Sequence, residues 1–345
     1  MTLHHGERSL GLYFFSALED GARGDAAGYR LLLDAARAAD DGGLDFLWLP
    51  ERHFTPFGGA HPNPSVLAAA VAVATRRIRI RAGSVVLPLH DPLRVAEEWA
   101  VVDNLSDGRV EIASAAGWNP RDFVLSPEAY ADRAARAHEN LRTVRELWAG
   151  GEVCRTGALG ERYAVRSYPR PVQAVLPHWV TAAGNPETFE YAGRIGAGVL
   201  TSYGAVTAAQ LTERIAAYRR AFEEHHGGTG RVSVMAHAAI GASGQQVRSE
   251  AEQPLRRYLA SYASQQEARG DQRTVEKSLD FAAQRYLRGR SLIGDRNEAL
   301  AVLQNIFATG ADEVACLVDF GVPRRTVLGT VDELAEIQAA LLRLP

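Results

Sequence analysis

The chain has 345 residues, of which 46% are hydrophobic and 23% charged, with a formal net charge of -3. These proportions are those of an ordinary globular protein and exclude disorder, collagen and coiled coil as overall classes. The balance of 38 basic and 41 acidic residues leaves no broad basic surface, so we expect no nucleic-acid partner.

The choice of basic residues and the number of cysteines indicate which side chains would bind an anion and which cellular compartment to expect. Lys277 is the only lysine, so an anion site in this chain would depend on arginine. Two cysteines are too few for a disulfide scaffold and favour a reducing compartment. The polar residues 1–9 carry no signal-peptide core, and the longest apolar run, Val66–Ala74, is far short of the ~20 residues that cross a membrane. We therefore expect a cytoplasmic protein with no membrane partner.

Short apolar strands alternate with amphipathic helices along the whole chain. The expected strands are Leu10–Ser16, Phe46–Pro50, Ile78–Leu87, Val110–Ala115, Trp179–Ala182, Gly198–Ser202, Val232–Ile240 and Glu313–Val318. The expected helices are Tyr29–Ala39, one capped by Ser65, one from Pro92 to Leu105, one opened by Ser126, then Pro186–Ile195, Thr207–Glu224, a stretch within Gly244–Arg290, and Val331–Leu342. Eight strands that are each followed by a helix predict an α/β protein, a closed (β/α)₈ TIM barrel in a single domain spanning 1–345.

Two segments are longer than ordinary loops. Residues 151–177 are rich in glycine, arginine and proline, and residues 253–290 are polar. Long segments of this kind in a compact domain are usually functional. We interpret both as insertions over the barrel mouth and as candidate lids.

In such a barrel the chemistry belongs at the carboxyl ends of the strands. Glu51, Arg52 and His53 follow the second expected strand. His53 is a candidate general acid or base, because histidine exchanges protons near neutral pH. A Glu51–Arg52 ion pair with the imidazole packed beside Phe54 explains the same residues equally well, so both interpretations stay open.

A second polar group follows the fifth expected strand, where Gly184, Asn185, Pro186 and Thr188 open a helix. Asparagine is a good N-cap and proline suits the first helical position, which explains the pattern by capping alone. The same helix N-terminus would also bind an anion through its free N–H groups. Phosphate sites in barrels more often follow strands seven and eight, which favours capping.

Other histidines give weaker signals. Asp91 after His90 is better explained as an N-cap than as an orienting partner. His4-His5 lies in the polar terminus and His225-His226 at a helix end, so we expect no metal site. The chain contains no Walker loop, no G-x-S-x-G elbow, no C-x-x-C and no dinucleotide fingerprint, so we expect no nicotinamide cofactor held in the Rossmann manner.

Four long motifs occur in order between about Gly11 and Ile240. They are DFLWLPERHFTPFGGAHPNPSV, RIRIRAGSVVLPLHDPLRVAEEW, DNLSDGRVEIASAAGWNPRDF and WVTAAGNPETFEYAG. Together they resemble the luciferase-like flavin-dependent monooxygenases, and more narrowly the subgroup of natural-product (polyketide or nonribosomal-peptide) pathways. The resemblance implies a barrel that binds reduced FMN from a separate flavin reductase. With O₂ as co-substrate it would oxygenate a small-molecule or carrier-bound intermediate, and a homodimer is plausible for the family.

The resemblance also implies roles for individual residues. Gly83-Ser84 would carry a non-proline cis peptide under the flavin ring. Phosphate would be held by Arg133 together with the Gly184 N–H, Asn185 and Thr188, and the odds at this helix terminus thereby shift from capping to phosphate. An aromatic residue that flanks the flavin falls at Tyr203, and the candidate pocket walls are Trp118, Phe14, Phe54 and Phe57.

Two positions depart from the bacterial luciferases. Arg52 replaces the first of two paired histidines, the catalytically important one, so only His53 remains as a catalytic candidate and light emission is not implied. Ala116 replaces a second phosphate-site arginine, which leaves more of the phosphate charge to Arg133 and implies weak FMN binding.

Two alternatives remain beside the monooxygenase. One keeps the barrel but uses the deazaflavin F420 for hydride transfer without O₂. The other is a non-catalytic, flavin-binding accessory protein, motivated by the missing first histidine.

Overall fold

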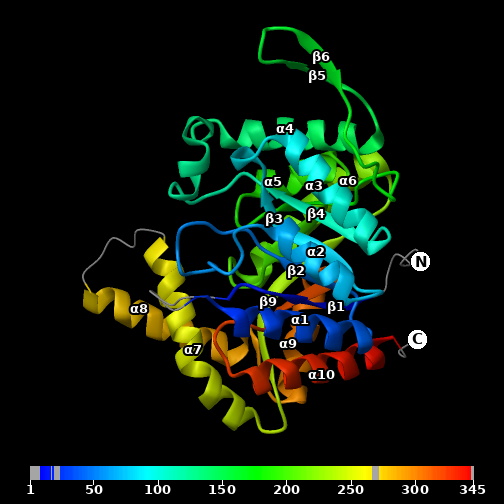
Figure 1. Cartoon of the computed structure of the whole chain (residues 1–345). Coiled ribbons are helices and arrows are strands. Elements are labelled where there is room, and N and C mark those ends of the chain that lie inside the picture. The colour runs from blue at the N-terminus through cyan, green and yellow to red at the C-terminus, as the bar shows by residue number, and fades with distance from the viewer. Residues whose placement is uncertain (1–7, 17, 19–23, 266–271, 343–345) are drawn as a thin grey trace.

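Eight parallel strands close into a barrel in the computed structural model (Figure 1), which describes residues 8–16, 18, 24–265 and 272–342. The barrel strands are β1 (Ser9–Tyr13), β2 (Phe46–Leu49), β3 (Arg79–Val86), β4 (Val110–Ala115), β7 (His178–Thr181), β8 (Gly198–Ser202), β9 (Val232–Ile240) and β11 (Glu313–Leu317). The order β9-β11-β1-β2-β3-β4-β7-β8 is closed by the pairing of β8 with β9. The predicted barrel is confirmed.

The strands are apolar and almost wholly buried because helices cover the outside of the barrel while side chains fill its interior. The surrounding helices are α1 (Ala26–Asp41), α2 (Pro64–Ala74), α3 (Pro92–Ser106), α4 (Arg133–Ala149), α5 (Pro186–Arg194), α6 (Ala208–His226), α9 (Arg296–Ala308) and α10 (Arg324–Leu341). All eight expected strands are present, and β4, β8 and β9 have the predicted bounds.

Two predicted helix starts are wrong. Asn63, rather than Ser65, caps α2, since its Oδ1 accepts the N–H of Ser65 at 3.0 Å and Pro64 takes the first helical position. Ser126 opens no helix, because its backbone is non-helical and its hydroxyl donates to Glu128 at 2.8 Å. Two short 3₁₀ turns (Asp122–Leu125 and Pro127–Ala129) come first, so α4 begins at Arg133.

The region between β9 and β11 holds elements that the sequence analysis missed. A short strand, β10 (Leu292–Gly294), pairs with the end of β9, and α9 follows it. The signal was present in the sequence, because Asp295 and Glu298 form a capping box at the start of α9. The last helix, α10, starts at Arg324, before the predicted Val331.

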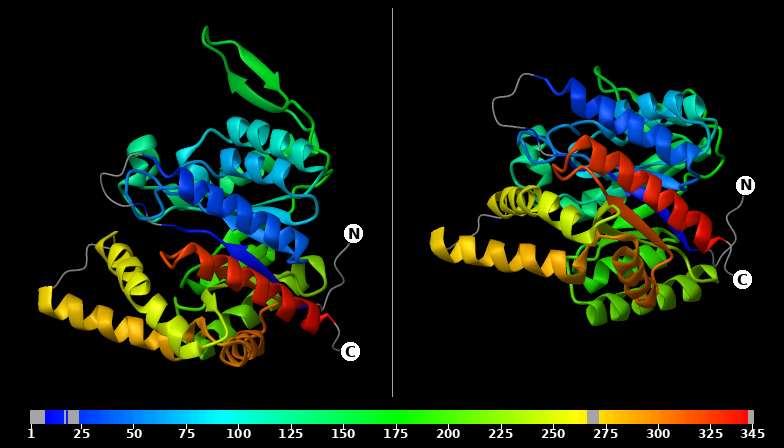
Figure 2. Two further views of the ribbon diagram at one scale, coloured as in Figure 1. Left: turned by 60° about the horizontal axis from the view of Figure 1, so that its bottom comes forward. Right: turned by 90° about the horizontal axis from the view of Figure 1, so that it is seen from below.

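The first insertion does not cover the barrel mouth. Residues 151–177 contain an antiparallel hairpin of β5 (Val153–Thr156) and β6 (Arg162–Val165), which projects away from the barrel (Figure 2). This segment joins the end of α4 to the start of β7, so it leaves the barrel from the end opposite to the carboxyl ends of the strands. The lid prediction is therefore wrong for this insertion.

The second insertion lies beside the mouth. The described part of residues 253–290 falls in α7 (Gly244–Gln265), α8 (Gln272–Arg285) and the π-helical turn Tyr286–Arg290. Both helices lie on the side of the barrel away from the chain termini (Figures 1 and 2). The rings of Tyr258 and Tyr262 on α7 pack against Phe57, with centroids 5.0 and 6.0 Å away. This insertion therefore helps to wall the mouth.

A buried ionic cluster occupies the barrel interior. The Arg81 side chain has no solvent exposure, and its guanidinium lies 2.7 Å from the Glu111 carboxylate and 2.5 Å from that of Glu313. The rings of Phe46 and Trp179 stack on it, with centroids 4.1 and 4.6 Å away. The charge of Arg81 on β3 thus joins this strand to β4, with which it is also hydrogen-bonded, and to β11, with which it shares no backbone hydrogen bonds.

Candidate active site

A cavity of about 550 Å³ opens at the carboxyl ends of β2, β3, β4 and β7 and extends between α4 and α5. Five of the predicted site residues line it, namely Gly83, Ser84, Trp118, Asn185 and Thr188. Its volume is in the range of small-molecule and cofactor pockets. Its position at the strand carboxyl ends is where barrel enzymes carry their active sites.

The peptide bond between Gly83 and Ser84 is cis, as the resemblance implies. The hydroxyl of Tyr13 donates a hydrogen bond to the Gly83 carbonyl, and the Ser84 hydroxyl lies 2.5 Å from that of Thr181. All four residues line the cavity. This part of the floor is therefore held by side chains from β1 and β7.

Arg52 belongs to a charged pair at the cavity wall. Its guanidinium donates to Asp122 at 2.7 Å and lies over the Trp118 ring, 4.9 Å from the centroid. The predicted Glu51–Arg52 pair is therefore wrong, because Asp122 on the turn after β4 takes the arginine. Trp118 in turn meets Tyr262 of α7, with ring centroids 6.0 Å apart.

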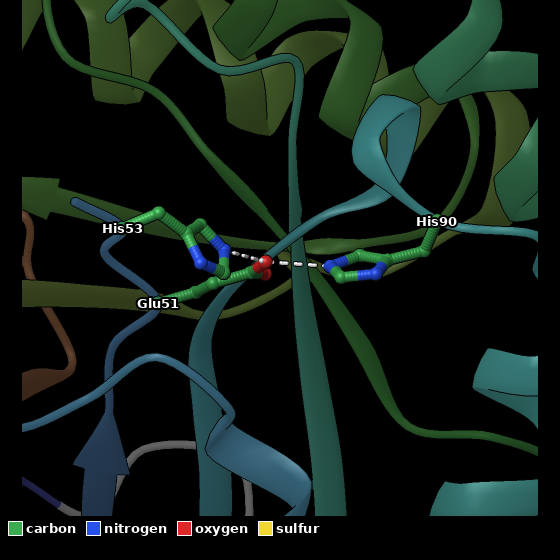
Figure 3. A group of neighbouring side chains, drawn as sticks. All are labelled: Glu51, His53 and His90. Atoms are coloured by element: carbon green, nitrogen blue, oxygen red, sulfur yellow. Dashed lines mark hydrogen bonds and ion pairs between the residues drawn. The ribbon is translucent and has the colours of Figure 1, made fainter. Parts of the chain in front are cut away.

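Glu51 instead binds two histidines (Figure 3). The Nε2 atoms of His53 and His90 lie 2.8 and 2.5 Å from its Oε1, and its Oε2 accepts the Val86 N–H at 2.7 Å. Burial alone raises the pKa of Glu51, but the hydrogen bonds from His53 and His90 outweigh it and lower that pKa. Glu51 therefore stays ionised inside the protein.

His53 sits behind the cavity wall and is not among the residues that line this cavity. Its ring packs on Phe54 at 5.6 Å, as the second interpretation of this motif expected. Asp91 caps α3 as predicted, through the N–H of Leu93 at 2.8 Å. Ligand-type atoms of Glu51, His53 and His90 lie within 4.8 Å of one another, a set that could hold a metal ion.

The start of α5 is capped as well as exposed to the cavity. Asn185 Oδ1 accepts the N–H of Glu187 at 3.1 Å, and Pro186 takes the first helical position. Asn185, Glu187 and Thr188 line the cavity, whereas Gly184 does not. Capping and anion binding are therefore compatible at this terminus, because Thr188 adds a hydroxyl that faces the cavity.

Two arginines are candidates for the phosphate charge, and one of them, at the last residue of α5, lines the cavity. Arg194 on α5 lines it and lies 3.7 Å from Glu190. Arg133 is not a lining residue, and its guanidinium donates to the carbonyls of Gly117 at 3.2 Å and Tyr130 at 2.9 Å. The sequence analysis missed Arg194, since nothing in the α5 pattern marks which face meets the cavity.

The predicted aromatic walls are mostly elsewhere. Tyr203 is buried, with Arg290 over its ring at 5.1 Å from the centroid. Phe14 and Phe57 are buried and Phe54 is exposed, and none of the three lines this cavity. Phe15, Tyr13 and Tyr191 do so in their place. His138, whose ring stacks on Tyr191 at 3.7 Å, lines the cavity too and was also missed.

Comparison with known families agrees with this geometry. The family model for luciferase-like monooxygenases matches residues 11–313. The chain belongs to the luciferase-like monooxygenase family. This membership supports an oxidoreductase. None of the described helices combines the length and apolar character needed to cross a membrane.

Relatives within the luciferase-like family use more than one cofactor. An F420-dependent glucose-6-phosphate dehydrogenase of Amycolatopsis mediterranei is 34% identical over 53% of this chain and 56% of its own length. The oxygenase component of a flavin-dependent trigonelline monooxygenase of Acinetobacter baylyi is 30% identical over 50% of this chain and 48% of its own. The chain thus spans about half the length of these curated relatives.

A solved structure matches over nearly the whole chain. A monooxygenase from Streptomyces bottropensis superposes with a TM-score of 0.82 at 25% identity, over 95% of this chain and 98% of its own. The barrel fold is therefore shared with that monooxygenase over nearly the whole of both chains.

Proposed function

We propose that this chain is an oxygenase that takes FMNH₂ from a separate reductase, uses O₂, and oxygenates an organic intermediate of a natural-product pathway. One observation carries the proposal. A single cavity joins a floor of small and apolar residues at Gly83-Ser84 to a polar side along α5, lined by Asn185 and Thr188 at the start of that helix and by Arg194 at its last residue.

The floor suits a flat ring system. Gly83, Ala115, Ala116 and Ala183 present little side-chain bulk, and Val86 adds an apolar contact. A Cβ at Gly83 would lie 2.9 Å from the Trp48 ring, so a larger side chain at this position would displace the floor. An isoalloxazine ring would be bound here by apolar contact, and its polar edge would meet the backbone around Ser84.

The other end suits a phosphate. Thr188 provides a hydroxyl and the α5 N-terminus provides a partial positive charge, while Arg194, the last residue of α5, adds a full positive charge to the lining of the same cavity. Arg133 is the first residue of α4, and its guanidinium donates hydrogen bonds to the carbonyls of Gly117 and Tyr130. In this proposal, Arg194 supplies the positive charge that the bacterial luciferases place at the position of Ala116.

Bound reduced flavin would supply two electrons, which activate O₂ so that one oxygen atom enters the substrate and the other leaves as water. The residues of the chain bind and orient the flavin and keep water out. The walls for that task are Phe15, Trp118 and the α7 tyrosine that packs on Trp118.

A second candidate, an F420-dependent oxidoreductase, is favoured by the 34% identity to the dehydrogenase of Amycolatopsis mediterranei. Such an enzyme would transfer hydride without consuming O₂. The two candidates therefore differ in whether atmospheric oxygen appears in the product.

The test is an isotope experiment. The protein is incubated with FMN, NADH, a separate flavin reductase and a small-molecule extract of its source organism under ¹⁸O₂. We expect products that carry one ¹⁸O atom and that require the protein, the reductase and O₂ together. Products without label, or products formed only with reduced F420, would overturn the proposal.

A further inference from the structure

Glu51 lies between two cavities. Besides the main cavity, it lines a second one of about 90 Å³ on the outer side of the barrel. His90 lines the second cavity, together with Arg94 and Glu98 of α3. No other titratable residue is shared by the two sets of lining residues among the part of the chain that the structure describes.

The contacts around Glu51 form a continuous hydrogen-bonded link across the wall. The Glu51 side chain has no solvent exposure, whereas the His90 side chain is 33% exposed. His90 Nε2 donates to Glu51 Oε1 at 2.5 Å, and His53 Nε2 meets the same oxygen from the other side at 2.8 Å (Figure 3). A half-exposed imidazole is thereby joined to a buried carboxylate at the main cavity.

We propose that His90 and Glu51 form a proton pathway between the solvent in the second cavity and the main cavity. The pathway itself stands on these contacts, and its use in turnover rests on the proposed function. When the flavin is bound as the anion FMNH⁻, oxygenation takes up one proton, because FMNH⁻, O₂, substrate and H⁺ give FMN, oxygenated substrate and water. The pathway would deliver that proton.

Each transfer is balanced. His90 gains a proton from water at Nδ1 while its Nε2 proton passes to Oε1 of Glu51. Glu51 then releases a proton into the main cavity and returns to a carboxylate. Rotation of the half-exposed imidazole restores the starting arrangement. No electrons move, and one proton crosses the wall in each cycle.

The charges that face the pair are consistent with this direction. Glu51 accepts a hydrogen bond from His53 and is close enough to Asp122 for the two carboxylates to repel each other. The carboxylate of Glu98 favours the charged form of His90. Burial lowers the pKa of His90, but its hydrogen bond to Glu51 more than offsets this and raises that pKa above the ordinary value. The proton therefore rests on the imidazole, at the solvent end, and moves inward only when a group in the cavity takes it.

The first test needs no cofactor. In ¹⁵N-histidine-labelled protein, NMR measures how fast the Nε2 proton of His53 exchanges with water, because that proton shares Glu51 Oε1 with His90. We expect His90→Ala to slow this exchange about a hundredfold, the low end of what a positioned proton carrier contributes. Added imidazole should restore the rate in His90→Ala but not in His90→Gln, where the amide fills the space.

His225→Gln, which removes an exposed imidazole at the end of α6, is the matched control and should change nothing. Unchanged exchange in His90→Ala, or slowing that imidazole does not reverse, would overturn the pathway. Tight binding of one Zn²⁺ to the wild type, lost in His90→Gln, would overturn it too, because the cluster would then be a metal site. A protein that passes this test but binds no FMNH₂ would refute the proposed function alone.

The second test uses the loaded protein. Reoxidation of bound FMNH₂ by O₂ should slow in His90→Ala, with a larger solvent deuterium effect than in the wild type, and imidazole should reverse both changes. Equal rates and equal deuterium effects in the two proteins would contradict a role of the pathway in turnover.

Discussion

Burial sets the charge state of individual residues in this barrel. His237 on β9 is fully buried among the rings of Tyr258, Tyr286 and Phe320, whose centroids lie 4.8–5.4 Å away. Its Nε2 has no hydrogen-bond partner among the described residues. Because burial penalises the imidazolium, the pKa of His237 falls to about 3. The imidazole is therefore neutral throughout the physiological range.

His237→Phe tests this assignment. The unfolded chain protonates this histidine below its ordinary pKa of 6.5, whereas the folded protein does not until about 3. Its contribution to stability is thus complete above pH 6.5 and is lost as the pH falls. Relative to wild type, the variant should gain about 1.4 kcal/mol of unfolding free energy per pH unit between pH 6 and 4. Denaturant unfolding measures this, and a difference that is independent of pH would contradict it.

The proposed phosphate contacts are tested with two ligands. Arg194→Ala should weaken FMN binding by about 1.5–3 kcal/mol, the value of a charge-assisted hydrogen bond. Riboflavin carries the same ring without phosphate, so its affinity should not change. Calorimetry on both ligands separates phosphate recognition from general damage. Equal losses for FMN and riboflavin would remove the assignment.

Single residues of the site were only partly predictable from the sequence. Gly83, Ser84 and Thr188 sit inside the long motifs, and all three line the cavity. Arg194 was missed, and so was the link between Glu51 and His90, which lie 39 positions apart in the chain. Only closure of β2 against β3 brings those two side chains together. Contacts of this kind depend on the fold and leave no local pattern.

At the level of elements, capping residues decide where helices begin. Asn63, Asp91, Asn185 and Asp295 each accept a backbone N–H at the start of a helix. The sequence analysis identified the second and third of these, chose Ser65 for the first and overlooked the last. Apolar periodicity therefore located most elements, and the misassigned starts of α2 and α4 came from reading Ser65 and Ser126 as caps.

Asp295 offers a clean test of this capping. Asp295→Ala removes the half of the α9 capping box in which Asp295 Oδ1 accepts the Glu298 N–H at 3.0 Å, and it should cost about 1 kcal/mol of unfolding free energy. Asp295→Asn keeps the oxygen acceptor and should cost much less. Urea unfolding of the two variants measures the difference, and equal losses would show that the cap contributes nothing to stability.

At the scale of the whole molecule, the buried side chain of Arg81 connects strands on different sides of the barrel through its ion pairs. The carboxylates of Glu111 and Glu313 both pair with this arginine. Burial alone would raise the pKa of Glu111, but the charge of Arg81 outweighs burial and lowers that pKa to about 2. The closed barrel was predictable because the alternation of strands and helices extends along the chain. The cluster was not, because Arg81 and Glu313 lie 232 positions apart.

Glu313→Gln should destabilise the whole barrel. It leaves Arg81 buried with one partner fewer, which typically costs about 3–5 kcal/mol. The matched control is Glu333→Gln, which breaks the exposed pair with Arg296 at 2.6 Å and should cost far less unfolding free energy, because solvent screens that pair. Thermal or urea unfolding compares them. Similar losses in both variants would mean that the interior pair adds nothing.

The central claim is that the cavity at the strand carboxyl ends holds reduced FMN. The most direct measurement is anaerobic calorimetry of the purified protein with FMNH₂ and, separately, with reduced F420. We predict saturable binding of FMNH₂, weakened in Arg194→Ala, and weaker or undetectable binding of F420. Tighter binding of reduced F420 than of FMNH₂ would contradict the account.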